Sequence, residues 1–246
     1  MSGGKAKRFW KQAAVERDGA GWGVRLDGRP VKTPAKSPLV VPTEAMARAI
    51  AAEWDAQEAE VKPASMPVTR AANSAIDKVT PQFHAVAAML ADYGGTDLLC
   101  YRADGPAPLV ARQAASWDPL LDWAAQHLGA PLACGTGVLP VAQAPDSLAR
   151  LMAEVHAFDP FRLTALHDLV AISGSLVIGL AVARGRIGVD DGWLASRIDE
   201  HWQAEQWGAD DEATAAEAVK RAAMADAARF LALCDGANAA AGSPAQ

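Results

Sequence analysis

The sequence predicts an α+β protein, with a small N-terminal antiparallel β domain followed by a larger, mostly α-helical domain. Up to about residue 61, apolar and polar residues alternate as in half-buried strands. From Thr69 nearly to the end, apolar residues recur at helical spacing instead. The proline-bracketed segment Lys62–Val68 separates the two patterns, as an extended linker would. We therefore expect domains over residues 1–62 and 63–235, and a disordered tail over residues 236–246.

The N-terminal domain is expected to be a small meander of strands. Residues 15–17 and 22–26 alternate between apolar and polar side chains. The pairs Asp18-Gly19 and Asp27-Gly28 follow these segments, and Asp-Gly suits the positive φ angles of a type I′ turn. Prolines 34 and 38 restrict the segments after the second turn to the edges or ends of the sheet.

One helix is expected to cover this sheet. It follows Thr43, whose hydroxyl suits a helix cap, and its apolar residues Met46, Ile50 and Trp54 repeat every four positions. Trp54 is therefore interpreted as a structural residue that packs on the strands. The basic residues before the first strand are interpreted as a solvated start of the chain: Lys5, Lys7, Arg8 and Lys11.

The larger domain is expected to contain helices over residues 69–79, 81–93, 108–116, 118–128, 145–158, 159–183, 191–207 and 210–233, with an extended piece at 97–102 and an irregular segment or short strand pair at 131–141. Within its most apolar helix, small residues recur every four positions: Ala171, Ser175, Gly179 and Ala183. Glycine costs a helix about 1 kcal/mol relative to alanine. Gly174 and Gly179 are therefore interpreted as structural residues that permit close helix packing.

Composition narrows the classes of function. The chain has 246 residues, 51% of them hydrophobic, which is enough for one large or two modest domains. A net charge of −6 argues against nucleic acid or an anionic membrane as the main partner. The apolar run 169–183 is shorter than the roughly 20 residues of a membrane span, and no signal-peptide pattern is present. Three scattered cysteines suit a reducing compartment, so we expect a cytoplasmic protein without membrane insertion.

Motifs for catalysis and cofactor binding are absent from the sequence. No glycine-rich segment ends in Gly-Lys-Ser/Thr, and no Gly-x-Ser-x-Gly or His-Glu-x-x-His motif occurs. We expect neither a cofactor nor a metal ion. An enzymatic alternative stays open, in which Asp199, Glu200 or His201 act as acid–base groups in a deep pocket.

The segment Trp193–Gly208 is the candidate site. As one helix, it places Leu194, Ala195, Ile198 and Trp202 on one apolar face and Trp193, Ala204 and Trp207 on another. Glu200 falls in the middle of the second face, three residues after Arg197, which is within pairing distance on a helix. Two interpretations stay open: a core helix whose glutamate is held by the arginine, or a partner-binding carboxylate among aromatic residues. The second makes four residues candidate contacts: Trp193, Arg197, Glu200 and Trp207.

A series of short motifs gives a resemblance to a known family. In chain order they are Arg8-Phe-Trp10, Leu26-Asp-Gly-Arg-Pro-Val-Lys-Thr-Pro34, Val41-Pro-Thr43, Glu53-Trp-Asp-Ala-Gln57, Met66-Pro-Val-Thr69, Asp97-Leu-Leu-Cys-Tyr-Arg102, Gln113, Trp117-Asp-Pro119, Gly174-Ser175, Asp199-Glu200, Trp202-Gln203 and Trp207-Gly208. The series resembles the assembly chaperones of the ATP synthase catalytic sector (F-one), the family whose members bind the alpha subunit. The match runs in the family's order from Phe9 to about Glu212.

The resemblance implies a function without catalysis. Such a chaperone holds the unassembled alpha subunit, shields its beta-facing surface and releases it into the hexamer. An acidic residue of the late helix is important in the family, and Glu200 matches it here, while Trp54 matches a second sensitive position. The start of the chain suggests a bacterial cytoplasmic member, whereas eukaryotic members lie in the mitochondrial matrix, and we expect a monomer. A regulatory subunit retained in the mature ATP synthase is the remaining alternative.

Overall fold

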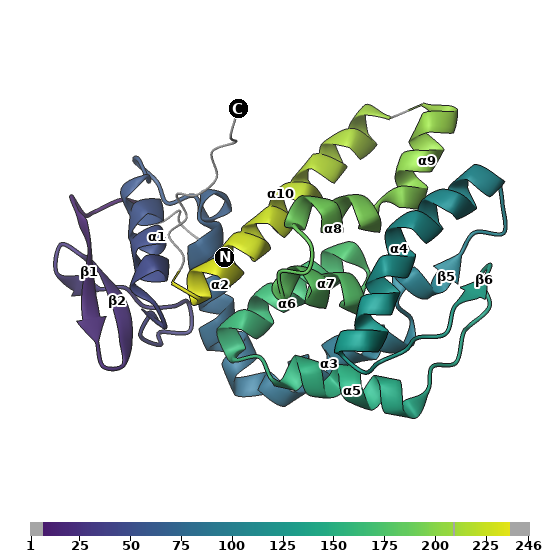
Figure 1. Cartoon of the computed structure of the whole chain (residues 1–246). Helices are drawn as coiled ribbons and strands as arrows, with labels where there is room; N and C mark the ends of the chain where they lie inside the picture. Colours follow the sequence, from purple (N-terminus) through teal and green to yellow (C-terminus); the bar gives the residue numbers. More distant parts are fainter. Residues whose placement is uncertain (1–6, 209, 237–246) are drawn as a thin grey trace, which may run out of the picture. The chain divides into compact units, whose positions relative to one another are not determined.

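The computed structural model describes residues 7–208 and 210–236, which form two compact units (Figure 1). The sheet unit contains the described residues up to Gln82, together with Pro160–Thr164 and residues 229–236. The helical unit contains Phe83–Asp159 and Ala165–Ala228. A small antiparallel sheet followed by a mostly helical region confirms the predicted α+β class. The expected tail lies outside the described residues beyond position 236.

The sheet unit is built on a four-stranded sheet around a central strand. β2 (Gly21–Leu26) pairs antiparallel with β1 (Ala13–Asp18), and also with the two-residue strands β3 (Arg29–Pro30) and β4 (Val40–Val41). Asp27 and Gly28, between β2 and β3, have φ angles of 47° and 80°. Two successive positive φ angles are those of a type I′ turn, which confirms the turn predicted from this Asp-Gly pair.

The covering helix is present as predicted. α1 (Glu44–Asp55) begins at Thr43, whose side chain accepts a hydrogen bond from the Met46 N–H at 3.2 Å. α1 packs on β1 and β2, and the side chains of Met46 and Ile50 are fully buried. The helix exists because its period-four apolar residues meet the buried face of the sheet.

The compact units do not divide at residue 62, where the sequence pattern changes. The connector is not extended: it contains the short helix η1 (Pro63–Ser65) and leads into α2 (Pro67–Ser74), η2 (Ala75–Val79) and η3 (Thr80–Gln82), all in the sheet unit. The buried Glu53 carboxylate accepts the backbone N–H groups of Val68 and Thr69 at 2.8 Å each, which caps α2. The Gln57 amide oxygen accepts the Lys62 N–H at 2.7 Å. These bonds fasten the connector to α1.

The helical unit is a bundle around one buried helix. Its elements are α3 (Phe83–Asp92), η4 (Tyr93–Gly95), η5 (Leu98–Cys100), β5 (Tyr101–Arg102), α4 (Ala107–His127), β6 (Gly135–Thr136), α5 (Pro145–His156), α7 (Leu176–Ala183), α8 (Val189–Ser196) and α9 (Ile198–Trp207), with parts of α6 (Pro160–Ser173) and α10 (Asp211–Cys234) (Figure 1). Residues 176–181 of α7 are all buried, so this helix forms the core. Among the described helices, none is both long and apolar enough to cross a bilayer.

The two helices expected over residues 108–128 are a single helix, α4, with Pro119 inside it. A proline removes one helical hydrogen bond and normally kinks or ends a helix. Here packing holds the residues on both sides, because Trp117 and Leu120 are 1% and 4% exposed. The Trp117 indole N–H also donates to the Ala195 carbonyl at 2.8 Å. Tertiary contacts thus override the local helix-breaking signal.

The single helix expected over residues 159–183 is instead two helices. α6 ends at Ser173, Gly174 adopts φ of 74°, and Ser175 caps α7 by accepting the Ile178 N–H at 3.0 Å. Glycine takes this left-handed conformation at little cost. The stripe of small residues therefore does not lie on one helix, because Ala171 belongs to α6 and Gly179 to α7.

Gly179 lies at a close contact between α6 and α7. A Cβ atom built on Gly179 would be 2.5 Å from Val170 Cγ2 and 3.4 Å from Leu166 Cδ1. No real carbon pair tolerates the first distance, so a side chain at this position forces the two helices or Val170 to move.

We predict that Gly179→Ala destabilises the protein, although alanine is the better helix former by about 1 kcal/mol. Overpacking typically costs about 1–3 kcal/mol, and the Val170 contact places this site in that class. Urea unfolding measures the change. The double variant Gly179→Ala/Val170→Ala should recover part of the loss, because it removes the clashing methyl groups. A Gly179→Ala protein as stable as the parent would contradict the close approach.

Candidate functional site

The segment from Trp193 to Gly208 is not one continuous helix. α8 ends at Ser196, whose hydroxyl donates to the Trp193 carbonyl at 2.8 Å, and α9 starts at Ile198. Arg197 lies between them with φ of −119° and ψ of 16°, outside helical geometry. Gly208 does end α9 with a φ of 89°, as the predicted C-terminal glycine.

Arg197 is a fixed cation at this break. Its guanidinium donates to the Ile172 carbonyl at 2.7 Å and to Glu200 Oε1 at 2.8 Å. It also lies over the Trp193 ring, 5.2 Å from the ring centroid. The Arg197 side chain is only 14% exposed, because these three groups surround it. A planar guanidinium with partners on several sides keeps one orientation, so it presents Glu200 in one place.

Glu200 lies on the exposed side of α9. Its side chain is 57% exposed even though it pairs with Arg197. Gln203 and Trp207, three and seven residues later, project from the same side of the helix, and both are exposed. Trp207 is 85% exposed. We call Glu200, Gln203 and Trp207 the α9 outer face, and it combines a carboxylate with a solvated indole.

The structure places one candidate contact residue, Trp193, and one residue of the other predicted apolar face, Leu194, elsewhere than expected. Trp193 is 2% exposed and lies beneath Arg197, so its ring supports the arginine instead of facing solvent. Leu194, which would face the core if the Glu200 face bound a partner, is instead 54% exposed. Both corrections have one cause: the break at Arg197 changes the helix phase, so α8 and α9 bury different sides. Exposed Leu194 is the surface residue that the sequence pattern missed.

Asp199 and His201 face different elements from Glu200. Asp199 Oδ1 accepts a hydrogen bond from the buried Gln113 amide of α4 at 2.6 Å. His201 Nε2 lies 2.6 Å from Glu217 Oε1 on α10. Asp199, Glu200 and His201, the acid–base groups of the enzymatic alternative, are therefore each paired with a different side chain. They do not converge on one reacting position, as acid–base catalysis requires.

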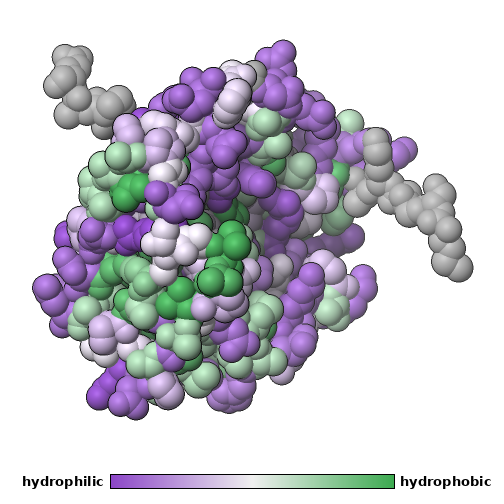
Figure 2. Space-filling model, turned by 90° about the vertical axis from the view of Figure 1, so that its right-hand side faces the viewer, coloured by the Kyte–Doolittle hydropathy of each residue, from purple (hydrophilic) through white to green (hydrophobic). Residues whose placement is uncertain are grey.

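Besides the Gln113–Asp199 hydrogen bond, an ion pair between Arg112 and Glu205 joins α4 to α9. The Arg112 guanidinium donates to both Glu205 oxygens, at 2.8 and 2.9 Å, and stacks over the Trp202 ring at 5.1 Å. These hydrogen bonds from Arg112 lower the pKa of the Glu205 carboxyl group. The pair is solvent-exposed and contributes little stability, but its bidentate geometry fixes the orientation of α9. Figure 2, viewed from the right of Figure 1, shows hydrophobic residues exposed among polar ones on this side of the molecule.

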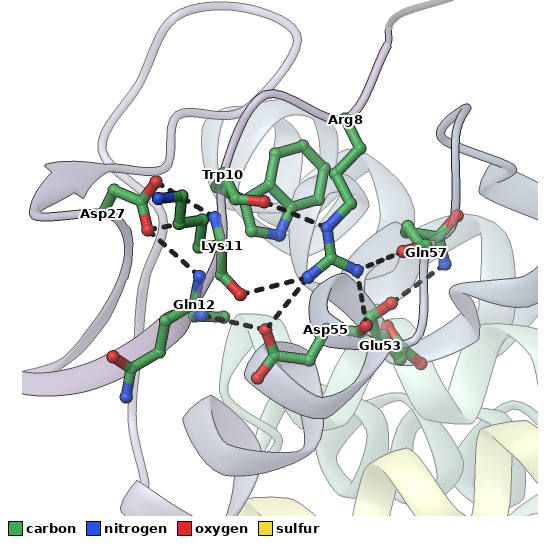
Figure 3. A network of polar contacts seen from close by, with 9 residues as sticks. Arg8, Trp10, Lys11, Gln12, Asp27, Glu53, Asp55 and Gln57 are labelled. Carbon is green, nitrogen blue, oxygen red and sulfur yellow. Dashed lines mark hydrogen bonds and ion pairs between the residues drawn. The ribbon is translucent and has the colours of Figure 1, made fainter.

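In the sheet unit, residues of the recognised motifs form a structural network (Figure 3). The Arg8 guanidinium donates to the backbone carbonyls of Trp10 at 3.0 Å and Asp55 at 2.8 Å, and also to that of Gln57. Asp27 accepts the Gln12 and Lys11 N–H groups, and these bonds, the Gln12 bond above all, lower its pKa. Arg8 is therefore not part of a solvated start: it ties the N-terminal segment to the end of α1.

Trp54 is half-buried at the end of α1, and its ring centroid lies 5.1 Å from that of Trp10 in an edge-on arrangement. We predict that Trp54→Ala lowers the unfolding free energy by about 2–3 kcal/mol, somewhat below the 3–5 kcal/mol typical of fully buried aromatics. Trp54→Phe should cost much less, because it keeps the aromatic contact and removes a buried indole nitrogen that has no hydrogen-bond partner among the described residues. Thermal melts of both variants test this, and an unchanged Trp54→Ala melt would place the residue outside the packing of the unit.

Metal binding by protein side chains needs several ligands in one place. Within the part of the chain that the structure describes, no cluster of three or more His, Cys, Asp or Glu side chains is arranged to hold a metal ion.

Comparison with solved structures defines the class of fold. The crystal structure of Atp12 from Paracoccus denitrificans is 58% identical to this chain and superimposes with a TM-score of 0.91, over 93% of this chain and 98% of that one. An aspartate-to-lysine mutant of the same protein gives the same TM-score at 57% identity. Atu1473 of Agrobacterium tumefaciens, a putative chaperone, is 41% identical with a TM-score of 0.87, over 92% of this chain and 85% of that one. The fold is therefore that of the Atp12 chaperones.

Sequence comparison agrees. The family model described as ATP12 chaperone protein matches residues 7–125. The mitochondrial protein atp12 of Schizosaccharomyces pombe is 24% identical over 221 residues, which are 84% of this chain and 75% of that protein. This chain belongs to the ATP12 chaperone family, which confirms the resemblance to the ATP synthase assembly chaperones that its motifs indicated.

Proposed function

We propose that this protein is an assembly chaperone of the ATP synthase catalytic sector that binds the unassembled alpha subunit. It shields the surface of that subunit that later meets the beta subunit, and it acts by binding, without catalysis or a cofactor. We place it in the bacterial cytoplasm as a monomer. Support comes from family membership and from the bacterial origin of the similar solved structures.

The observation that carries the proposal is the α9 outer face. The Trp207 side chain is 85% exposed and free to contact a partner protein. Aromatic residues are enriched where proteins bind one another, so Trp207 is a candidate contact. Glu200 lies on the same face, and its carboxylate can accept hydrogen bonds from an arginine or a backbone N–H of the alpha subunit. Arg197 already holds this carboxylate in place, so binding costs little side-chain entropy.

The arrangement also suits transient binding. A carboxylate that keeps its Arg197 partner is not left unpaired when the client departs, so release does not leave a buried charge uncompensated. The rest of the face, Gln203 and Trp207, is polar and aromatic, as in interfaces that form and dissociate. A chaperone that hands its client to an assembling complex needs this reversibility.

The test uses the full-length chain immobilised on beads and three separate samples: free alpha subunit, free beta subunit and the assembled catalytic sector. We expect capture of free alpha subunit alone. Stoichiometric binding to the assembled sector would instead favour the retained regulatory subunit. No capture of free alpha subunit, under conditions in which that subunit stays soluble, would contradict the proposal.

A further inference from the structure

Cys100 and Cys134 occupy matching positions beside the parallel strand pair of the helical unit. Cys100 immediately precedes β5 and Cys134 immediately precedes β6. The register pairs Tyr101 with Gly135, so one step back along both strands places the two cysteines opposite each other. Neighbouring strands lie about 4.8 Å apart, which is within the Cα separation of about 4.4–6.8 Å that a disulfide spans.

Side-chain contacts bring the two sulfur atoms into the same neighbourhood. Cys134 Sγ lies 3.9 Å from the carbonyl oxygen of Leu99, the residue bonded to Cys100. The pKa of the Cys100 thiol is raised to about 12, mainly by burial, and the nearby Asp97 and Cys134 add to the effect. Part of the Cys134 contribution to this pKa is a hydrogen bond between the two thiols. Register and contacts therefore agree that the thiols are neighbours.

The two thiols differ in access to solvent. Cys134 is exposed, whereas Cys100 is fully buried. A small oxidant reaches Cys134 directly, whereas Cys100 is shielded from solvent. From this geometry we propose that Cys100 and Cys134 form a reversible disulfide, in which Cys134 is the reacting thiol and Cys100 resolves the intermediate. The proposal is independent of the proposed function.

The oxidant is a low-molecular-weight disulfide such as oxidised glutathione. The Cys134 thiolate attacks one of its sulfurs, forms a mixed disulfide and releases one glutathione thiolate. The Cys100 sulfur then attacks Cys134 Sγ and displaces the second glutathione as a thiolate, which takes up the proton that the Cys100 thiol gives up. In sum, two protein thiols and one oxidised glutathione give one protein disulfide and two reduced glutathiones. The raised pKa of Cys100 keeps this thiol largely protonated, which slows the second step.

This disulfide joins the base of the segment 131–144 to the start of β5. Reciprocal hydrogen bonds between the Gln143 amide and the Ala133 backbone, at 2.8 and 2.9 Å, already close the base of that segment. Its tip displays Val138 and Leu139, which are 94% and 76% exposed. Oxidation therefore restrains a loop with two solvated aliphatic side chains.

The test incubates the full-length protein with oxidised glutathione and counts free thiols after denaturation. We expect a loss of two of the three thiols, a Cys100–Cys134 peptide in the mass map, slower hydrogen exchange in residues 131–144 and full reversal by dithiothreitol. Three variants separate the steps. Cys100→Ala should stop at a glutathione adduct on Cys134, Cys134→Ala should keep both remaining thiols, and the control Cys234→Ala should form the disulfide like the parent.

Three results would overturn the proposal. They are retention of all three thiols, a wild-type reaction that ends at the glutathione adduct, and a disulfide between the Cys134 residues of two molecules. Because the wild-type chain itself supplies the main readout, the result does not depend on the folding of a variant.

Discussion

Asp97→Ala is expected to lower the unfolding free energy by several kcal/mol, on the order of 3–5. Asp97 is fully buried, and its carboxylate accepts hydrogen bonds from Ser175 Oγ at 2.7 Å, Val177 N at 3.0 Å and Leu99 N at 3.1 Å. Alanine leaves these donors without their acceptor inside the core. Each unsatisfied buried group costs about 1–3 kcal/mol, and water that enters the vacated space offsets part of the sum.

Urea unfolding of the parent and variant measures this loss. The matched control is Asp92→Ala, which removes an exposed carboxylate at the end of α3 and should change stability by no more than about 0.5 kcal/mol. If Asp97→Ala unfolded at the same urea concentration as the control, the join between α6 and α7 would have another source of stability.

The same residue predicts a pH dependence. Burial raises the pKa of the Asp97 carboxyl, and its hydrogen bonds to Val177, Ser175 and Leu99 oppose this only in part. A carboxyl with a raised pKa holds its proton more tightly in the folded than in the unfolded state. Its stabilising contribution is therefore complete below the unfolded value of about 3.9 and is lost as pH rises through the folded pKa.

Asp97→Asn removes this titration and keeps the size of the side chain. The unfolding free energy of the parent relative to Asp97→Asn should therefore fall as pH rises from about 3.5 through the folded pKa. Urea titrations across this range measure the difference. A relative stability that rises with pH would mean that the hydrogen bonds dominate over desolvation.

The sheet unit could be predicted from sequence because its signals are local. A type I′ turn at Asp27-Gly28 and a period-four stripe in α1 depend on residues within one turn of each other. The boundary after Gln82 could not be predicted in the same way. It depends on the Glu53 carboxylate, which reaches across 15 residues to cap α2, and nothing local identifies its partner.

The helical breaks have the same explanation. Apolar residues flank Gly174 and Ser175 on both sides, and the join is held by Asp97, about 80 residues earlier in the chain. At Arg197 the partner is the Ile172 carbonyl, 25 residues away. A single helical phase extended across this break predicts an exposed Trp193 and a buried Leu194, the reverse of what the structure shows. Glu200 and Trp207 lie after the break on one continuous helix, so their common side could be derived from spacing alone.

Glu200→Lys is expected to abolish capture of the alpha subunit while leaving the fold intact. The Arg197–Glu200 pair is mostly solvent-exposed on the glutamate side, so its loss should change stability by about 1 kcal/mol or less. At an interface, loss of one side of a charged hydrogen bond costs about 2–5 kcal/mol of binding, which is roughly 30-fold to several-thousand-fold in affinity. Lysine adds repulsion toward any cationic donor of the client, so it should be worse than Glu200→Gln.

Trp207→Ala tests the other half of the α9 outer face. An indole that is 85% exposed contributes almost nothing to folding, so the melting temperature of the Trp207→Ala protein should stay near that of the parent. As an aromatic anchor it should cost at least about 2 kcal/mol of binding, or roughly 30-fold in affinity. Normal capture by this variant would confine the contact to the Glu200 end of the helix.

The experiment pairs thermal melts with capture of free alpha subunit from a co-expression extract. The matched control is Asp122→Lys, which makes the same change of charge at an exposed position of α4 in the same unit and should bind like the parent. A large drop in the melting temperature of Glu200→Lys would assign the glutamate to the packing of α9 against its neighbours. Normal capture by both Glu200 variants would remove it from the interface. Loss of capture that Asp122→Lys shares would indicate that net charge, and not the α9 outer face, attracts the alpha subunit.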